Sequence, residues 1–215
     1  MKLNEIKLME SEFLTDEDEI FQWITDNFNS PTIKVKRSSL EIKNGVVNST
    51  MKISLRLRTR IQQLSVKFGT IEGAFETAVD TLASFKGFPV NVTGVQDGSV
   101  TGYMRCGGKK ITSLEGITQK ADTIIISKTG IKSLHNIHKH ILECRTIFVP
   151  NFTSHGLSLL LIKNINRLAI TNDYYDHPSY RAIEIIKKYL GKGKAGVLAA
   201  QTELEDAGLE DFAQL

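Results

Sequence analysis

The sequence lacks the features that mark most secreted and membrane-spanning proteins. Its two cysteines are too few for a disulfide framework, and they show no spacing typical of a thiolate metal site. The N-terminal stretch MKLNEIKLMESEF contains no apolar run followed by a small-residue cleavage site. The longest largely apolar run, LSLLLI at 157–162, is far too short to span a membrane. We therefore expect a soluble protein of the reducing cytoplasm, with no membrane contact.

A strong charge of one sign is also missing. The formal net charge is +3, an excess too small by itself to indicate a nucleic-acid-binding protein. Hydrophobic residues make up 41% of the chain, which predicts a packed core rather than disorder. The length of 215 residues allows one large domain with small caps at its ends.

Patterns that carry catalysis or bind metals are absent as well. The stretch HNIHKH at 135–140 is the strongest metal candidate, but no flanking carboxylate or cysteine completes a ligand set, so we interpret it as a solvated turn. GGKK at 107–110 lacks the Walker pattern for phosphate binding. Cys106 occupies an apolar position of the repeat described below, where a buried thiol is inert. We expect no enzyme activity, no cofactor and no metal.

What the sequence does contain is an internal repeat. Residues 104–117, MRCGGKKITSLEGI, are followed at an offset of twenty residues by IIISKTGIKSLHNI at 124–137. The matched pairs are either identical or both apolar: Met104 with Ile124, Cys106 with Ile126, Ile111 with Ile131, Ser113 with Ser133, Leu114 with Leu134, and Ile117 with Ile137. Six matches in one register indicate a true repeat, and its period falls in the range of leucine-rich repeats.

Further units lie on both sides of this pair. Phe75 precedes Met104 by 29 residues, the extra length being an excursion within VNVTGVQDGSV. Ile53 begins a corresponding unit before Phe75, and TIFV at 146–149 begins a later one. Each unit combines a short strand, apolar at alternate positions, with a turn and a returning segment.

A single unit of this kind cannot fold alone. Ordering the backbone costs about 1–2 kcal/mol per residue, whereas burying a large apolar side chain returns only about 1.5–3 kcal/mol. Neighbouring units must therefore supply hydrogen-bond partners and the remaining walls of the core. The alternative is an antiparallel sheet whose hairpins are alike by chance. The repeat favours the solenoid.

The stretches VVNSTMKISLRLRTRIQQLSVKFGTIEGAF, LASFKGFP and ITSLEGI resemble the leucine-rich-repeat-like proteins of tailed bacteriophages. In that family, units of the form L-T-S-L-x-G-x-P alternate with short strands, and the end of this chain, from SHGLSLLLIKNINRLAI onwards, is similar to the family's helical tail. The resemblance runs from about residue 44 to the last residue. The chain departs from the family's CSNN signature, with ETAV at 76–79 and SKTG at 127–130. The resemblance implies a fold but no established activity.

The two ends of the chain are expected to be helical. LTDEDEIFQWITDNFNS is typical of an amphipathic helix with Thr15 as its N-cap, and Pro178 suits the first turn of a later helix that Gly191 ends. A last helix is expected at about 195–206. We therefore expect an α+β fold: a short leucine-rich-repeat-like β-solenoid at 33–152, an N-terminal helical segment at 1–32 and a helical C-terminal cap at 153–215.

A binding surface follows from the same register. If the aligned apolar positions face the core, the residues between them face outward, one per coil. The predicted protein-binding residues are Arg56, Glu76, Arg105, Ile125 and Phe148. Ile125 and Phe148 are apolar, and adjacent exposed apolar groups mark contact sites; the alternative is that the C-terminal helices cover them.

These observations favour a non-enzymatic protein–protein interaction module, and the phage resemblance implies a host or phage protein as partner, in the host cytoplasm. A second hypothesis is nucleic-acid binding through the outward face of KISLRLRTR, with Arg56, Arg58 and Arg60 as its residues. No aromatic residues interleave with these arginines to stack bases. A third hypothesis is self-assembly into a homo-oligomer.

Overall fold

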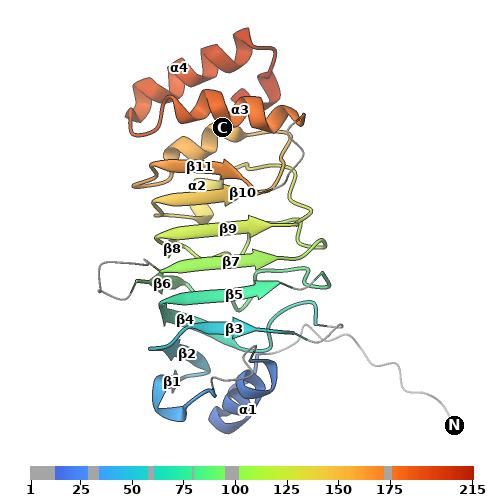
Figure 1. Ribbon diagram of the computed structural model, residues 1–215, viewed down its shortest axis with the longest axis vertical. Helices are drawn as coiled ribbons and strands as arrows, with labels where there is room; N and C mark the ends of the chain where they lie inside the picture. The colour runs from blue at the N-terminus through green and yellow to red at the C-terminus, as the bar shows by residue number, and fades with distance from the viewer. Residues whose placement is uncertain (1–12, 29–33, 58–60, 79, 95–101, 172–175) are drawn as a thin grey trace, which may run out of the picture.

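A computed structural model describes residues 13–28, 34–57, 61–78, 80–94, 102–171 and 176–215 of the chain. The structure is a mixed α/β fold built around a β-solenoid of about 5 turns, with a few helices (Figure 1). Arg58, Arg60 and the greater part of the excursion after Gly94 lie outside the described residues. The solenoid confirms the architecture that the repeat predicts.

One face of the solenoid is a six-stranded sheet in which every pairing is parallel. Its strands, in spatial order, are β3 (Ile53–Leu55), β5 (Ala74–Ala78), β7 (Tyr103–Gly107), β9 (Thr123–Ser127), β10 (Thr146–Val149) and β11 (Arg167–Ile170). The pairings match Ile53 with Phe75, Phe75 with Met104, and Met104 with Ile124. The register read from the repeat is thus confirmed.

The second face is a five-stranded sheet whose strands are two to six residues long. In spatial order they are β1 (Leu40–Lys43), β2 (Val46–Ser49), β4 (Lys67–Glu72), β6 (Asn91–Thr93) and β8 (Lys120–Ala121). Only β1 and β2 pair antiparallel. They form a hairpin around Asn44 and Gly45, whose φ angles of 52° and 72° are those that a tight Asn-Gly hairpin turn requires.

The two sheets enclose the hydrophobic core. Phe68 on β4 and Phe75 on β5 meet across it with ring centroids 5.2 Å apart, and Phe88 packs on Phe75 at the same distance. Each strand of the six-stranded sheet contributes one apolar residue to a line of inward-facing side chains. All six of these residues are buried: Ile53, Phe75, Met104, Ile124, Ile147 and Leu168. Each coil therefore adds its apolar side chains to one continuous core.

Backbone hydrogen bonds also run from coil to coil at the corners between the sheets. The N–H of Asp122 donates to the carbonyl of Gly102 at 2.9 Å, and the N–H of Arg145 donates to the carbonyl of Asp122 at 3.0 Å. Gly102 has no room for a side chain, because a Cβ atom there would lie 2.5 Å from the carbonyl oxygen of Val92. Successive coils are therefore joined by backbone hydrogen bonds at the corners as well as along the strands.

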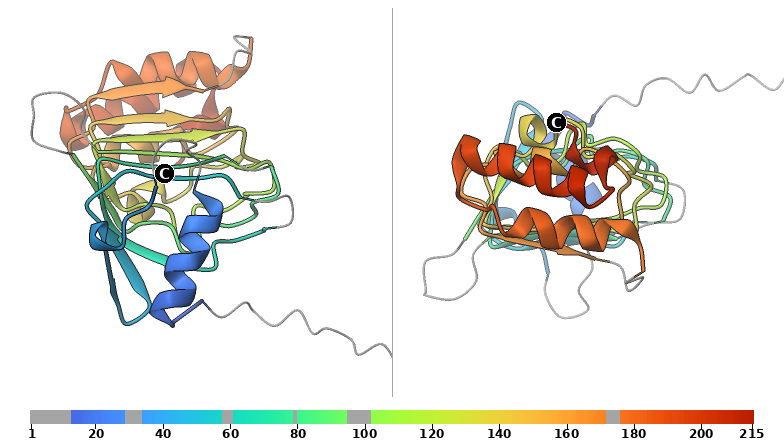
Figure 2. Two further views of the ribbon diagram at one scale, coloured as in Figure 1. Left: turned by 60° about the horizontal axis from the view of Figure 1, so that its bottom comes forward. Right: turned by 90° about the horizontal axis from the view of Figure 1, so that it is seen from above.

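The three longest of the described helices lie at the two ends of the solenoid (Figures 1 and 2). At the N-terminal end, α1 (Glu17–Asn27) begins after Asp16, whose carboxylate accepts hydrogen bonds from the N–H groups of Asp18 and Glu19 at 2.9 and 3.0 Å. The N-cap is therefore Asp16 and not Thr15, because a carboxylate one residue later reaches both free N–H groups.

Beyond β11, α3 (Pro178–Lys187) packs on that strand and α4 (Gly193–Asp206) packs on α3. The remaining helical segments are one turn or two turns long: η1 (Arg37–Ser39), α2 (Ile137–His140), η2 (Gly156–Leu161) and η3 (Glu210–Ala213). The strand ladder continues past residue 152, where the sequence analysis placed the end of the repeats, because β11 pairs with β10.

A substitution at Ile126 tests which residues of β9 face the core and which face outward. The side chain of Ile126 is 0% exposed in the core, so Ile126→Asp buries an unpaired charge and is expected to destabilise the protein by about 4 kcal/mol or more. Circular dichroism melts measure the effect. The matched control is Ile125→Asp, the neighbouring residue of the same strand on the outer face, which should melt close to the wild type. Equal loss of stability in the two variants would contradict the assignment.

Candidate functional site

The first candidate site is the outward face of the six-stranded sheet. Strand pairing places one outward residue per coil in a line, which we call the strand-face row: Ser54, Glu76, Arg105, Ile125, Phe148 and Ala169. Four of the five predicted protein-binding residues, Glu76, Arg105, Ile125 and Phe148, are therefore brought together on adjacent coils.

Arg56 is not a member of this row. The residue paired with Glu76 is Ser54, and Arg56 follows β3 by one residue. Its N–H group donates to the carbonyl of Asn27 at 2.7 Å, so the chain leaves the parallel ladder there and meets the end of α1. The side chain of Arg56 is exposed. Its predicted place in line with Glu76 is wrong by two positions, because strand alternation alone does not show where a short strand ends.

One end of the strand-face row carries a hydrogen-bonded network. The ammonium group of Lys52 lies 2.8 Å from a carboxylate oxygen of Glu76 and donates to the hydroxyl of Tyr103 at 3.0 Å. The hydroxyl of Tyr103 in turn donates to the other carboxylate oxygen of Glu76. Three side chains from three successive coils are thus held in one arrangement.

This network changes the pKa values of its charged members. Burial opposes ionisation of Glu76, but hydrogen bonds from Lys52 and Tyr103 outweigh it and hold the pKa of the carboxyl below its ordinary value of 4.5. Burial likewise opposes the charge of Lys52, yet its hydrogen bonds to Glu76 and Tyr103 raise the pKa of the ammonium group. Both groups are therefore charged across the neutral range.

The other end of the row is largely apolar. Arg105 is exposed and forms no ion pair with any residue in the described parts of the chain. Next to it, Ile125 and Phe148 are half-buried, and the guanidinium of Arg167 lies 5.9 Å from the ring centroid of Phe148. None of the described helices lies over this face, since α3 and α4 sit beyond β11 (Figures 1 and 2).

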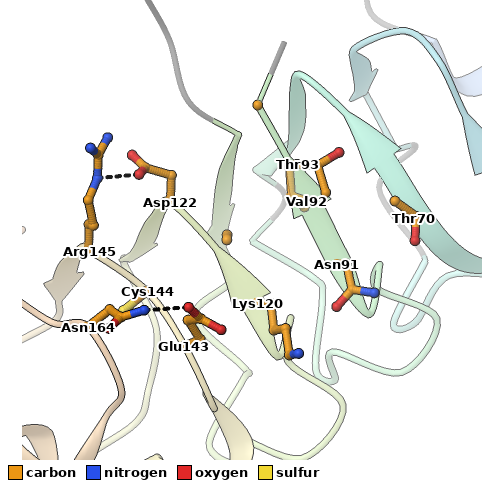
Figure 3. Close-up of a pocket in the computed structure, with 12 residues that line it drawn as sticks. Thr70, Asn91, Val92, Thr93, Lys120, Asp122, Glu143, Cys144, Arg145 and Asn164 are labelled. Atoms are coloured by element: carbon orange, nitrogen blue, oxygen red, sulfur yellow. Dashed lines mark hydrogen bonds and ion pairs between the residues drawn. The ribbon is translucent and has the colours of Figure 1, made fainter. Parts of the chain in front are cut away.

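The second candidate site lies on the five-stranded sheet. Thr70, Asn91 and Lys120 are matched in register on β4, β6 and β8, and an isolated bridge continues the line from Lys120 to Glu143. These residues line a cavity of about 530 Å³, and Arg145 and Asn164 are among the other residues that line it. We call this cavity the polar groove, and Figure 3 shows it in close-up.

Hydrogen-bonded and ion-paired side chains occupy one side of the polar groove. The guanidinium of Arg145 donates to the carboxylate of Asp122, and the amide of Asn164 donates to the carboxylate of Glu143 (Figure 3). The ammonium group of Lys163 lies 4.0 Å from the same Glu143 carboxylate. Hydrogen bonding to Asp122 raises the pKa of Arg145. Both carboxylates of the groove are thus engaged by neighbouring donors.

This groove was not predicted from the sequence. Its strands are only two to six residues long, and the residues between them vary in number. The coils are nevertheless in register, since Thr70, Asn91, Lys120 and Glu143 each follow a returning segment of the repeat. The recurrence of a polar residue after each returning segment was the sequence pattern that could have predicted the groove.

The cysteines and histidines add no further site among the described residues. Cys106 and Cys144 are both buried. Burial raises the pKa of both thiols, that of Cys144 to about 12 with a contribution from Asp122, so neither is a ready nucleophile. Within the described ranges, no group of three or more histidine, cysteine or acidic residues is arranged to hold a metal ion.

His135 and His155 instead contact one another, with ring centroids 4.7 Å apart in an edge-to-face arrangement. One ring nitrogen of His135 lies 3.2 Å from the carbonyl oxygen of Leu215, and Nδ1 of His155 lies 3.0 Å from the hydroxyl of Ser133. Their contacts join the solenoid to the segment after α4.

Comparison with protein-family models, curated proteins and solved structures gave no match for this chain. Among the described helices, none has the length and apolar character needed to cross a membrane. The function proposed below therefore rests on the geometry and chemistry of the strand-face row and the polar groove.

The stability contributed by Glu76 is expected to depend on pH. Because folding lowers its pKa, its contribution is fully present above 4.5, the ordinary value, and is lost as the pH falls through the lowered pKa. Glu76→Gln should therefore be less stable than the wild type at neutral pH, with the difference shrinking in acid. Urea unfolding at a series of pH values measures this.

Tyr103→Phe is the control for the network. It removes one hydrogen bond to Glu76 but keeps the ion pair with Lys52, so part of the pH dependence should remain. A stability difference between wild type and Glu76→Gln that is the same in acid and at neutral pH would show that the network does not hold the carboxylate in its charged form.

Proposed function

We propose that this protein is a non-enzymatic binding module that contacts another protein through the strand-face row. The observation that carries the proposal is Arg105, which is exposed and has no ion-pair partner within the described residues, beside the half-buried Ile125 and Phe148. The described helices leave this face open (Figure 1).

The chemistry of the row supports a protein partner. Parallel sheets are ordinarily covered on both faces, so an open face with apolar side chains has the character of a contact surface. Arginine and aromatic residues are enriched at interface centres, and a guanidinium pairs with a carboxylate through two parallel hydrogen bonds. The complementary partner carries a carboxylate facing Arg105 and apolar side chains facing Ile125 and Phe148.

The type of repeat and the capping of the solenoid's two ends are part of the same proposal. We regard the solenoid as leucine-rich-repeat-like, with α1 covering one open end and α3 and α4 capping the other, since a solenoid needs polar-faced elements over its terminal coils. The resemblance to proteins of tailed bacteriophages, over most of the chain, points to a host or phage protein as partner, in the cytoplasm of the infected cell.

Two other activities compete with this proposal. Nucleic-acid binding would use Arg56, which is exposed, together with Arg58 and Arg60, which lie outside the described residues. Self-assembly would use the same open face between two copies of the chain. Salt distinguishes the first, because phosphate contacts weaken steeply as the salt concentration rises, whereas an apolar contact changes little.

Affinity capture with the tagged protein tests the proposal, using cell lysates with and without nuclease at low and high salt. A protein retained by the wild type after nuclease and high salt is expected to bind about tenfold more weakly to Phe148→Ala and to Arg105→Ala. Both variants should melt like the wild type, because neither side chain belongs to the buried core.

Matched controls lie away from the strand-face row. Leu198→Ala removes an apolar side chain on α4 that is 58% exposed, and Lys110→Ala removes an exposed cation of a turn; neither should change the binding. Retention of nucleic acid that is lost at high salt and with Arg56→Ala would replace the proposal with the nucleic-acid hypothesis. Sedimentation that changes with protein concentration and with Phe148→Ala would replace it with self-assembly.

A further inference from the structure

The polar groove offers a set of hydrogen-bonding groups that the described residues do not use. Lys120 forms no ion pair, and no side-chain hydrogen bond of Thr70, Asn91 or Lys120 is found among the described residues. The three side chains come from successive coils of the five-stranded sheet. In Figure 3, Asn91 and Lys120 lie across the groove from the Arg145–Asp122 pair.

Their spacing is set by the solenoid. Parallel strands lie about 4.8 Å apart, so a ligand along the groove meets a new polar side chain at each such step. Thr70 and Asn91 provide a hydroxyl and an amide, each able both to donate and to accept. Lys120 provides a cation near the middle of the line, and Glu143 with Asn164 lies one coil beyond it.

An extended peptide is a poor match for this groove. Peptides that bind along a sheet add a strand to an open edge, where free backbone groups pair with them. Here the backbone groups of the groove already pair along the solenoid: the N–H of Ala121 donates to the carbonyl of Glu143 at 3.2 Å, and the N–H of Cys144 donates to that of Lys163 at 3.1 Å.

A polyphosphate chain is also a poor match. Such a ligand carries a negative charge on every unit and requires a run of cations. The groove instead places Glu143 next to Lys120 in the line, and Asp122 is paired with Arg145. Only Lys120 remains without a carboxylate partner among the described charged groups of the groove, which suits one negative charge flanked by neutral polar groups.

These features together fit a short chain of polyhydroxylated units that bears one carboxylate between neutral units. We propose that the polar groove binds an acidic oligosaccharide lengthwise, with the ammonium of Lys120 on a uronic acid carboxylate and Asn91 and Thr70 on the hydroxyls of adjacent sugars. The length of one pyranose unit is close to the coil spacing of about 4.8 Å. A volume of about 530 Å³ lies within the range of small-ligand sites. This site is separate from the strand-face row and does not depend on the function proposed for that row.

Nuclear magnetic resonance titration of the ¹⁵N-labelled full chain tests the proposal. The probe is a trisaccharide with one glucuronic acid between two neutral glucose units, called the glucuronate trisaccharide below. The expected result is saturable shifts of the amide signals of Asn91, Lys120 and Glu143. Lys120→Gln should weaken binding about tenfold, because a charge-assisted hydrogen bond to the carboxylate is lost. Lys110→Gln, an exposed lysine outside the groove, should bind like the wild type.

Two comparison ligands sharpen the result. Cellotriose has a similar length without a carboxylate and should bind more weakly than the glucuronate trisaccharide, whereas triglutamate carries carboxylates on a peptide and should not shift the groove signals. The proposal is overturned if the glucuronate trisaccharide leaves the groove signals unchanged, or if it binds Lys120→Gln as tightly as the wild type. It is equally overturned if cellotriose or triglutamate binds as tightly as the glucuronate trisaccharide. The amide signals of the wild-type groove show whether each ligand binds, so the proposal is tested even if a variant folds poorly.

Discussion

The structure depends on one constraint, namely that no coil can bury its own apolar side chains or pair its own strand. Each coil contributes a few inward residues, such as Met104 and Cys106, and needs the coils on either side to enclose them. Stacking in register satisfies the core, the strand ladders and the corner hydrogen bonds at once. The same register then determines the surface, because outward residues of successive coils must also lie in lines about 4.8 Å apart. The strand-face row and the polar groove are both consequences of this stacking.

Much of the six-stranded sheet could be predicted from the sequence, because its inward residues are apolar and recur at a readable offset. The pairings of Phe75 with Met104 and of Met104 with Ile124 follow directly from that pattern. Arg56 could not be placed in the same way. The position that pairs with Glu76 is Ser54, and the chain leaves the ladder immediately afterwards, where its backbone meets Asn27. Alternation gives the side on which a residue lies, but it does not show where a strand of three residues ends.

The five-stranded sheet was harder to anticipate for a related reason. Its strands are as short as Lys120–Ala121, and the outward residues of the groove are polar, so they give no hydrophobic period. Which of these polar residues become neighbours is decided by register across coils of unequal length. The hairpin turn at Asn44 and Gly45, in contrast, carried a recognisable Asn-Gly signal between alternating apolar residues that the sequence analysis did not use. The two surfaces also differ chemically. One combines Arg105, which has no ion-pair partner within the described parts of the chain, with apolar side chains, whereas the other places Lys120 beside the neutral polar side chains of Thr70 and Asn91.

The stacking itself is tested most directly by the distance between the ends of the strand-face row. Spin labels at Ser54→Cys and Ala169→Cys sit on β3 and β11, the outermost strands of the six-stranded sheet, while the native Cys106 and Cys144 are buried and should not be labelled. Five strand intervals predict one narrow distance distribution centred at about 24 Å. A broad distribution, or one centred far from this value, would show that the coils do not stack in the register on which both surfaces depend.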